Sequence, residues 1–236
     1  MLGKLKKAFL TAASLLISYS LFLISGPALA QTSAGPQFMI TWQASGSYVP
    51  PGYIGKALPN QGSKISASVA LVSNGQLVNL GKRTVYWYLN DTLIGGGIGV
   101  QNISFTPFGG APNFMTLKVE IPNYNGNLLL HAIQIPLVEP KAAIEAQHVN
   151  GKFSSNPLAL TGTPYYFNTA DPSSLTYQWS VNGQSPATAE NPQTLQVNLD
   201  QGTPSGSSFA VALTIANPAD TMTAADTANL TYVKQP

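Results

Sequence analysis

The feature that most restricts the fold is a strand-and-turn pattern that occurs twice. Residues 84–97 read TVYWYLNDTLIGGG, and residues 175–184 read LTYQWSVNGQ. In both copies inward and outward positions alternate, which is the period of a half-buried β-strand. The alternation turns Trp87 and Trp179 inward, so the pattern predicts two equivalent strands, each held to a core by one tryptophan.

A two-residue turn follows each tryptophan at the same distance. Asn90-Asp91 and Asn182-Gly183 tolerate the positive φ angles of a tight hairpin turn, and Asn-Gly is the stronger signal of the two. A late strand also recurs, as LKVEIPN ending at Asn123 and as VALTIAN ending at Asn217. These spacings predict an internal repeat of about ninety residues, each unit with six or seven short strands.

The boundary between the two repeats falls in the segment VEPKAA. Pro140 ends the first set of strands there, because proline does not continue a ladder. The first β-sandwich is therefore predicted at residues 38–140 and the second at residues 141–236.

The N-terminal thirty residues have the composition of an export signal. The segment combines a basic start with lysines at 4, 6 and 7, an apolar stretch over residues 8–25 and the cleavage motif Ala28-Leu29-Ala30. We predict a signal peptide at 1–30, a disordered leader at 31–37, and an extracellular or cell-surface location, with the periplasm as an alternative. A second alternative is an uncleaved membrane anchor, because the apolar stretch approaches the length that crosses a bilayer.

Charge and cysteine content argue against a nucleic-acid partner and against stabilisation by disulfides. Three of the 11 Lys+Arg and none of the nine Asp+Glu lie in the first thirty residues, which leaves eight basic against nine acidic residues. A near-neutral mature chain does not favour nucleic acid, so no nucleic-acid partner is expected. The chain has no cysteine, so each exported domain depends on its apolar core alone.

The repeated pattern resembles bacterial immunoglobulin-like domains, and the second half resembles the PKD-like branch. WSVNG at Trp179–Gly183 and VALTIAN at Val211–Asn217 carry this resemblance. The first half departs from it, with Asp91 in place of glycine and three glycines at 95–97. The resemblance implies an all-β chain of two tandem immunoglobulin-like (PKD-like) β-sandwiches, and it specifies fold rather than task.

The resemblance also implies which residues stand where many immunoglobulin domains carry a disulfide. These are Val69 or Leu71 on one strand and Val119 on another. Apolar packing is therefore expected in place of the bridge.

Residues that would support catalysis are few. His131 and His148 belong to no metal-spaced pair or triad, and GGGIG at 95–99 lacks the lysine and helix of a phosphate loop. We therefore predict no enzyme activity, no cofactor and no metal, and we interpret the glycines as a bulge or hairpin. Calcium at the domain junction is the open alternative, through Glu139, Glu145 and Asp171.

Four tyrosines are the candidate binding residues. Tyr86 and Tyr88 point away from the core in the predicted strand, and Tyr48 and Tyr53 flank two prolines in a long first-domain loop. Exposed rings stack on sugars or anchor partners, although tyrosine is also common on strands for structural reasons.

Together these observations predict a non-catalytic secreted or cell-surface module that acts as a spacer, adhesion element or protein-interaction scaffold. The alternative is an accessory carbohydrate-binding module that uses the exposed tyrosines. The expected partner is a cell-envelope protein or a glycan, and membrane contact is expected only through an uncleaved leader.

Overall fold

The computed structural model describes residues 35–108, 113–148, 150–186 and 191–234. The predicted signal peptide at 1–30 and residues 31–34 of the predicted leader lie outside the described residues. Within the described ranges no helix is long and apolar enough to cross a membrane. These ranges contain fifteen β-strands and one three-residue 3-10 helix, η1 (Pro172–Ser174), so the prediction of an all-β chain is confirmed.

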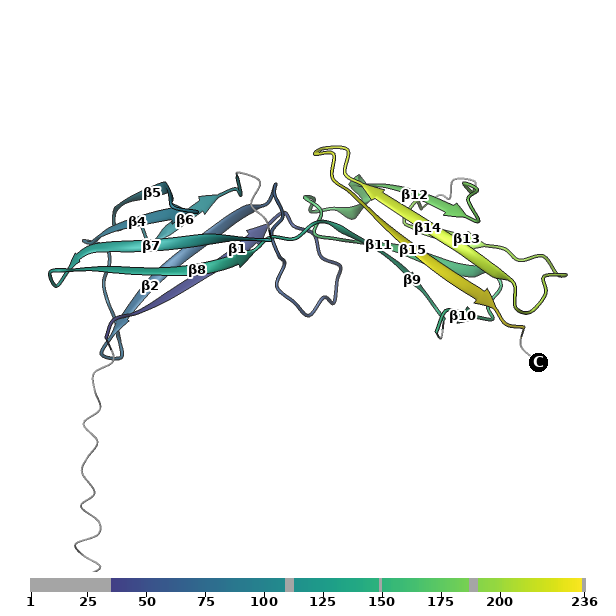
Figure 1. Cartoon of the computed structure of the whole chain (residues 1–236), viewed down its shortest axis with the longest axis horizontal. Coiled ribbons are helices and arrows are strands. Elements are labelled where there is room, and N and C mark those ends of the chain that lie inside the picture. Colours follow the sequence, from purple (N-terminus) through teal and green to yellow (C-terminus); the bar gives the residue numbers. More distant parts are fainter. Residues whose placement is uncertain (1–34, 109–112, 149, 187–190, 235–236) are drawn as a thin grey trace, which may run out of the picture. The chain divides into compact units, whose positions relative to one another are not determined.

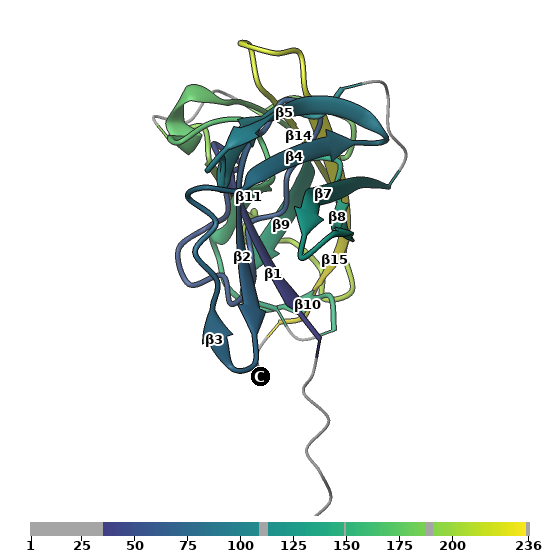
Figure 2. The ribbon, with the colours of Figure 1, turned by 90° about the vertical axis from the view of Figure 1, so that its left-hand side faces the viewer.

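The first eight strands form one β-sandwich (Figure 1). They are β1 (Gln37–Ser45), β2 (Lys64–Ser73), β3 (Gln76–Leu77), β4 (Thr84–Leu89), β5 (Thr92–Ile98), β6 (Asn102–Phe105), β7 (Phe114–Tyr124) and β8 (Asn127–Pro136). One sheet has β2 at its centre, with β1 on one side and β3 and β6 on the other. The facing sheet has the order β5-β4-β7-β8. Figure 2 shows β4 and β5 in one layer and β1 and β2 in the other.

The remaining strands form the second sandwich. They are β9 (Lys141–Ala146), β10 (Lys152–Phe153), β11 (Leu158–Tyr165), β12 (Thr176–Val181), β13 (Thr194–Val197), β14 (Ser208–Ala216) and β15 (Thr223–Tyr232). Its sheets have the orders β13-β11-β9 and β10-β15-β14-β12. Every pairing in the two sandwiches is antiparallel except that of β10 with β15.

Each sandwich has its own apolar core between its sheets. Trp87 is fully buried in the first core and Trp179 is 9% exposed in the second, so the predicted inward orientation of both is confirmed. Trp87 Nε1 donates to the Val100 carbonyl at 2.9 Å, and Trp179 Nε1 donates to the Pro192 carbonyl at 3.0 Å. Both acceptors lie 13 residues after their tryptophan, so the two repeats satisfy the buried indole N–H in the same way.

The predicted turns are also confirmed. The φ angles are 46° and 65° at Asn90 and Asp91, and 51° and 78° at Asn182 and Gly183. The Oδ1 atoms of both asparagines accept from the late strand, from the N–H of Thr116 in one repeat and of Ala210 in the other. Asparagine therefore recurs because it both tolerates positive φ and ties the hairpin to the neighbouring strand.

Two strand lengths differ from those predicted. The first strand begins at Gln37, inside the predicted leader, and the strand containing LKVEIPN continues past Asn123 to Tyr124. Asn123 instead lies at a shift in the β7–β8 register and has a φ of 55°. The glycines lie in the second strand of the β4–β5 hairpin, but the bulge falls beside them: Trp87 pairs with Gly95 and Tyr88 with Leu93, so Ile94 is the extra residue while Gly95–Gly97 pair with β4.

Candidate functional site

The most distinctive surface is the outer face of the β5-β4-β7-β8 sheet, which we call the tyrosine face. Two cross-strand rows form its centre. Tyr86 lies opposite Glu120 on β7, which lies opposite Leu130 on β8. Tyr88 lies opposite Lys118 in the next row. The register therefore brings both predicted outward tyrosines beside side chains that are distant in sequence.

Exposed hydrophobic side chains gather on the tyrosine face. Strand alternation and register place six of the twelve large exposed hydrophobics of the described ranges there. They are Tyr86 (36% exposed), Phe114 (47%), Leu93 (55%), Leu128 (55%), Leu130 (56%) and Ile98 (74%). Single exposed apolar residues are ordinary, but six of them on one sheet face favour an interaction surface there.

Gly96 sets the position of the Tyr86 ring. A Cβ at Gly96 would stand 2.5 Å from Tyr86 Cδ1 and 2.8 Å from the Val85 carbonyl oxygen. The ring therefore lies directly over the glycine of the neighbouring strand, which explains why a residue without a side chain is needed there. This arrangement holds Tyr86 flat against the sheet instead of letting it project freely.

A small charged cluster lies in the middle of the tyrosine face. Lys118 Nζ is 3.2 Å from Asp91 Oδ1 and 3.3 Å from Glu120 Oε1, and it stands 4.6 Å from the centroid of the Tyr88 ring. The hydrogen bond to Asp91, followed by that to Glu120, raises the pKa of Lys118. Partial burial, with Glu120 adding to it, raises the pKa of Tyr88. The cluster thus places one lysine between two carboxylates, beside the Tyr88 ring.

The other two candidate tyrosines lie in the loop at 46–63. The Tyr53 hydroxyl is 2.6 Å from that of Tyr166, and its ring packs edge-on against Tyr165 and Tyr166. Tyr48 makes two main-chain hydrogen bonds, donating to the Phe167 carbonyl and accepting from Tyr166 N–H. Burial, followed by the hydrogen bond with Tyr53, raises the pKa of Tyr166 to about 12. The structure thus does not bring Tyr48 and Tyr53 to the tyrosine face, and it gives both a structural role.

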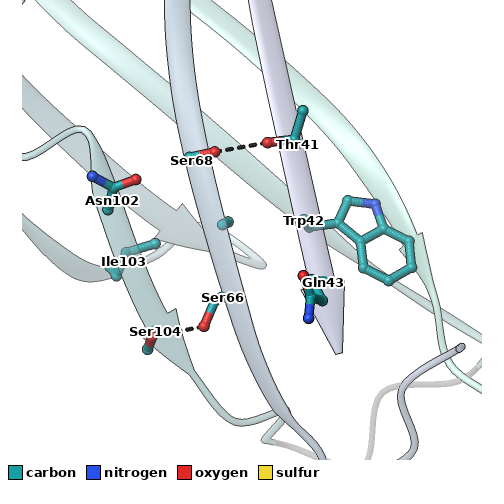
Figure 3. A pocket seen from close by; sticks show the side chains of 9 residues that line it. Thr41, Trp42, Gln43, Ser66, Ser68, Asn102, Ile103 and Ser104 are labelled. Atoms are coloured by element: carbon teal, nitrogen blue, oxygen red, sulfur yellow. Dashed lines mark hydrogen bonds between the residues drawn. The ribbon is translucent and has the colours of Figure 1, made fainter. Parts of the chain in front are cut away.

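A second surface is a shallow polar groove on the outer face of β1, β2 and β6 (Figure 3), with a volume of about 470 Å³. Two rows of short uncharged side chains line it: Thr41, Ser68 and Asn102 in one, and Gln43, Ser66 and Ser104 in the other. Hydrogen bonds join the Thr41 and Ser68 hydroxyls at 2.7 Å and the Ser66 and Ser104 hydroxyls at 3.0 Å.

The groove presents hydroxyl and amide groups without a single charge. Such a lining suits a neutral polar ligand rather than an ion. The groove was not predicted from the sequence. Serines at alternate positions of a strand do not indicate a groove until β6 is known to lie beside β2.

Each of the two histidines makes one contact that belongs to the fold. The His131 ring stacks on Phe38 at a centroid distance of 5.6 Å, and His148 Nδ1 accepts from the Gly151 N–H at 3.0 Å. Across the described ranges, no three histidine or acidic side chains come close enough together to hold a metal ion.

Comparisons with known proteins give low similarity. No protein-family model and no curated protein matches the chain. Among solved structures, it is similar to three N-terminal domains of the bacteriophage RB49 Highly Immunogenic Outer Capsid protein. That match has a TM-score of 0.42 and 11% identity and covers 84% of this chain and 59% of the other, so this chain spans less than two thirds of the capsid fragment.

Two further matches are weaker. Fibronectin(III)-like modules of Clostridium thermocellum CbhA match with a TM-score of 0.29 and 14% identity, covering 83% of this chain and 95% of theirs. A 1.5-MDa bacterial ice-binding adhesin matches with a TM-score of 0.31 and 13% identity, covering 86% of this chain and 67% of its own.

Proposed function

We propose that this chain is an exported, non-catalytic binding module that acts as a protein-interaction scaffold at the cell surface, with the tyrosine face as its contact surface. The observation that supports it is that the register places six exposed hydrophobic side chains, Tyr86 among them, on one face of a single sheet. Interfaces are enriched in aromatic residues relative to the rest of the surface. The pair of Lys118 with Asp91 and Glu120 supplies the polar component that gives such a contact its orientation.

The interpretation of the second sandwich as PKD-like belongs to this proposal, and so does export through the segment at 1–30. N-terminal sequencing of the native protein tests the export part. A sequence beginning at Gln31 supports cleavage, and one beginning at Met1 supports the anchor.

The contact surface is tested by recovery of cell-envelope proteins on the purified chain. We expect Leu130→Lys to abolish the recovery of a specific partner, because the new charge would be buried in the interface. Leu77→Lys is the matched control, since Leu77 is an exposed leucine of β3, outside the tyrosine face, with 73% exposure. Equal recovery on both variants would remove the tyrosine face from the proposal.

A carbohydrate-binding function is the second candidate, favoured by the uncharged lining of the polar groove. Binding on a glycan array that is lost in Ser66→Trp, which fills the groove, would support a sugar there. Binding that is lost in Tyr86→Ala would instead support a sugar stacked on the tyrosine face. An array without binding would exclude this candidate.

A further inference from the structure

We propose that the free edge of β1 pairs with β1 of a second copy of this chain, antiparallel and centred on Thr41. The pairing would join two β1-β2-β6 sheets into one continuous sheet across a two-fold axis. It uses the edge of the sandwich, so it is separate from the tyrosine face.

The β1 edge is regular and has no strand beside it among the described residues. The nine residues of the strand pair with β2 without a register shift, and they include no charged residue, glycine or proline. Among the described strands, only β2 pairs with β1. Alternate main-chain N–H and C=O groups therefore point away from β2 with no strand to bond them, which is the condition under which an edge recruits another strand.

The second repeat shows how the equivalent edge is closed. Asp226 of β15 lies on the same rung as Trp179, through Leu213. Its Oδ2 accepts from the N–H of Ile144 on β9 at 2.8 Å, so a carboxylate occupies the edge.

The first repeat lacks this carboxylate. The residue on the same rung as Trp87, through Val119, is His131. Its ring stacks on the Phe38 side chain. No carboxylate therefore takes the place here that Asp226 has beside the main chain of β9. The two repeats share a fold and differ at this edge, which indicates that the first edge is left open.

Apolar side chains remain half-buried along the open edge. Phe38, Ile40 and Trp42 pack against the first core and are only partly buried. Figure 3 shows the Trp42 ring on the side of β1 that faces away from β2. A strand added at this edge would cover the remaining apolar surface, which favours association.

The sequence of β1 is complementary to itself in the proposed register. With Thr41 opposite Thr41 of the second copy, Ile40 faces Trp42 and Phe38 faces Ala44. Aromatic–β-branched pairs and Thr–Thr pairs are among the favourable cross-strand contacts, and the large ring of Phe38 meets a small side chain. On the outer face Met39 meets Gln43, so no like charges face one another. This self-complementarity favours a second copy over an unrelated strand.

One charge limits the affinity. Lys56 Nζ stands 3.3 Å from the centroid of the Trp42 ring, and a lysine beside an edge opposes pairing. We therefore expect Lys56→Ala to associate more tightly than the unmodified chain.

Cysteine cross-linking tests the register directly, because the chain has no cysteine of its own. Opposed residues of an antiparallel pair have Cα atoms about 4.5–5.5 Å apart, within disulfide range. Ser68→Cys is the matched control, because Ser68 lies beside Thr41 on β2 and its two copies would be about 14 Å apart. We expect Thr41→Cys to form a disulfide-linked dimer at least about tenfold faster than Ser68→Cys. Equal rates, or no cross-link from Thr41→Cys, would overturn the proposal.

Sedimentation equilibrium of the purified chain gives the second test. Thr41→Lys is expected to weaken dimerisation by about tenfold or more, since two lysines would face each other. Mixing it with Thr41→Glu should restore dimers, whereas Ser68→Lys should leave association unchanged. A single-chain mass at every concentration would overturn the proposal, even if the edge then accepts a strand of another protein.

Discussion

Gly96 is the residue whose replacement best tests the geometry of the tyrosine face. Gly96→Ala would place a methyl group 2.8 Å from the Val85 carbonyl oxygen as well as against the Tyr86 ring. We expect a loss of about 1–3 kcal/mol in the free energy of unfolding, because the main chain has to shift. Urea denaturation measures it. Gly202→Ala is the control, since a Cβ there meets nothing within 4 Å. Equal stability of the two variants would contradict the position assigned to the Tyr86 ring.

Tyr177 gives the second repeat a defined alkaline sensitivity. Its hydroxyl donates to the Pro172 carbonyl at 3.0 Å, and burial, which outweighs the opposing hydrogen bond from Gln193, raises its pKa to about 12. Tyrosine in an unfolded chain titrates near pH 10. The neutral form is thus favoured in the folded state, so this contribution to stability is fully present below about pH 10 and is lost as the pH rises towards about 12.

Comparison with Tyr177→Phe isolates that contribution. Between about pH 9 and about pH 11, the unmodified chain is expected to lose more unfolding free energy than the variant, which has no phenol to ionise at this position. Urea titrations at the two pH values measure the difference. Identical losses in both proteins would show that Tyr177 is not shielded from solvent as the structure has it.

At the scale of single elements, the closed edge of the second repeat depends on one carboxylate. Asp226→Ala leaves the Ile144 N–H of β9 without its acceptor, and a hydrogen bond to a charged group contributes about 1.5–3 kcal/mol. We expect a loss of that order in unfolding free energy, measured by urea denaturation. Asp226→Asn keeps an acceptor oxygen and should lose less. An Asp226→Ala variant as stable as the unmodified chain would exclude this role for Asp226.

Local sequence pattern predicted most of these elements correctly but not their edges. The strands that carry Trp87 and Trp179, and the positive-φ turns after them, depend on alternation and on asparagine and glycine chemistry within a few residues. The two-residue strands β3 and β10 and the crossing of the chain from β9 to β10 were not predicted. Both strands are too short to leave a periodic pattern in the sequence. Their positions are set by pairing with β2 and β15, and β15 is far from β10 in the chain.

At the scale of the whole molecule, the two cores share no residue. Removal of Trp87 should therefore destabilise the first sandwich and removal of Trp179 the second, each by about 3–5 kcal/mol. Scanning calorimetry of Trp87→Ala and Trp179→Ala is expected to show one transition moved to lower temperature and the other retained. If either variant kept the melting profile of the unmodified chain, the assignment of that tryptophan to its core would be wrong.

The outward orientation of Tyr86 and Tyr88 came from the sequence, whereas their neighbours came from the fold. Alternation within six residues is enough to turn Trp87 inward and both tyrosines outward. Their role in binding stays a prediction, and so does that of Tyr48 and Tyr53. Both of these contact Tyr166, Tyr53 through its hydroxyl and Tyr48 through its main-chain carbonyl.

The sequence by itself thus determined the strand period, the two turns, the repeat and the inward tryptophans, because each depends on residues close together in the chain. Only the tertiary structure decided that Glu120 and Leu130 flank Tyr86, that Gly96 lies beneath its ring, and that β1 keeps an open edge. These features depend on the register between strands separated by loops of variable length. A shift of one residue in the pairing of β7 with β4, for example, would turn Glu120 to the other face, away from Tyr86.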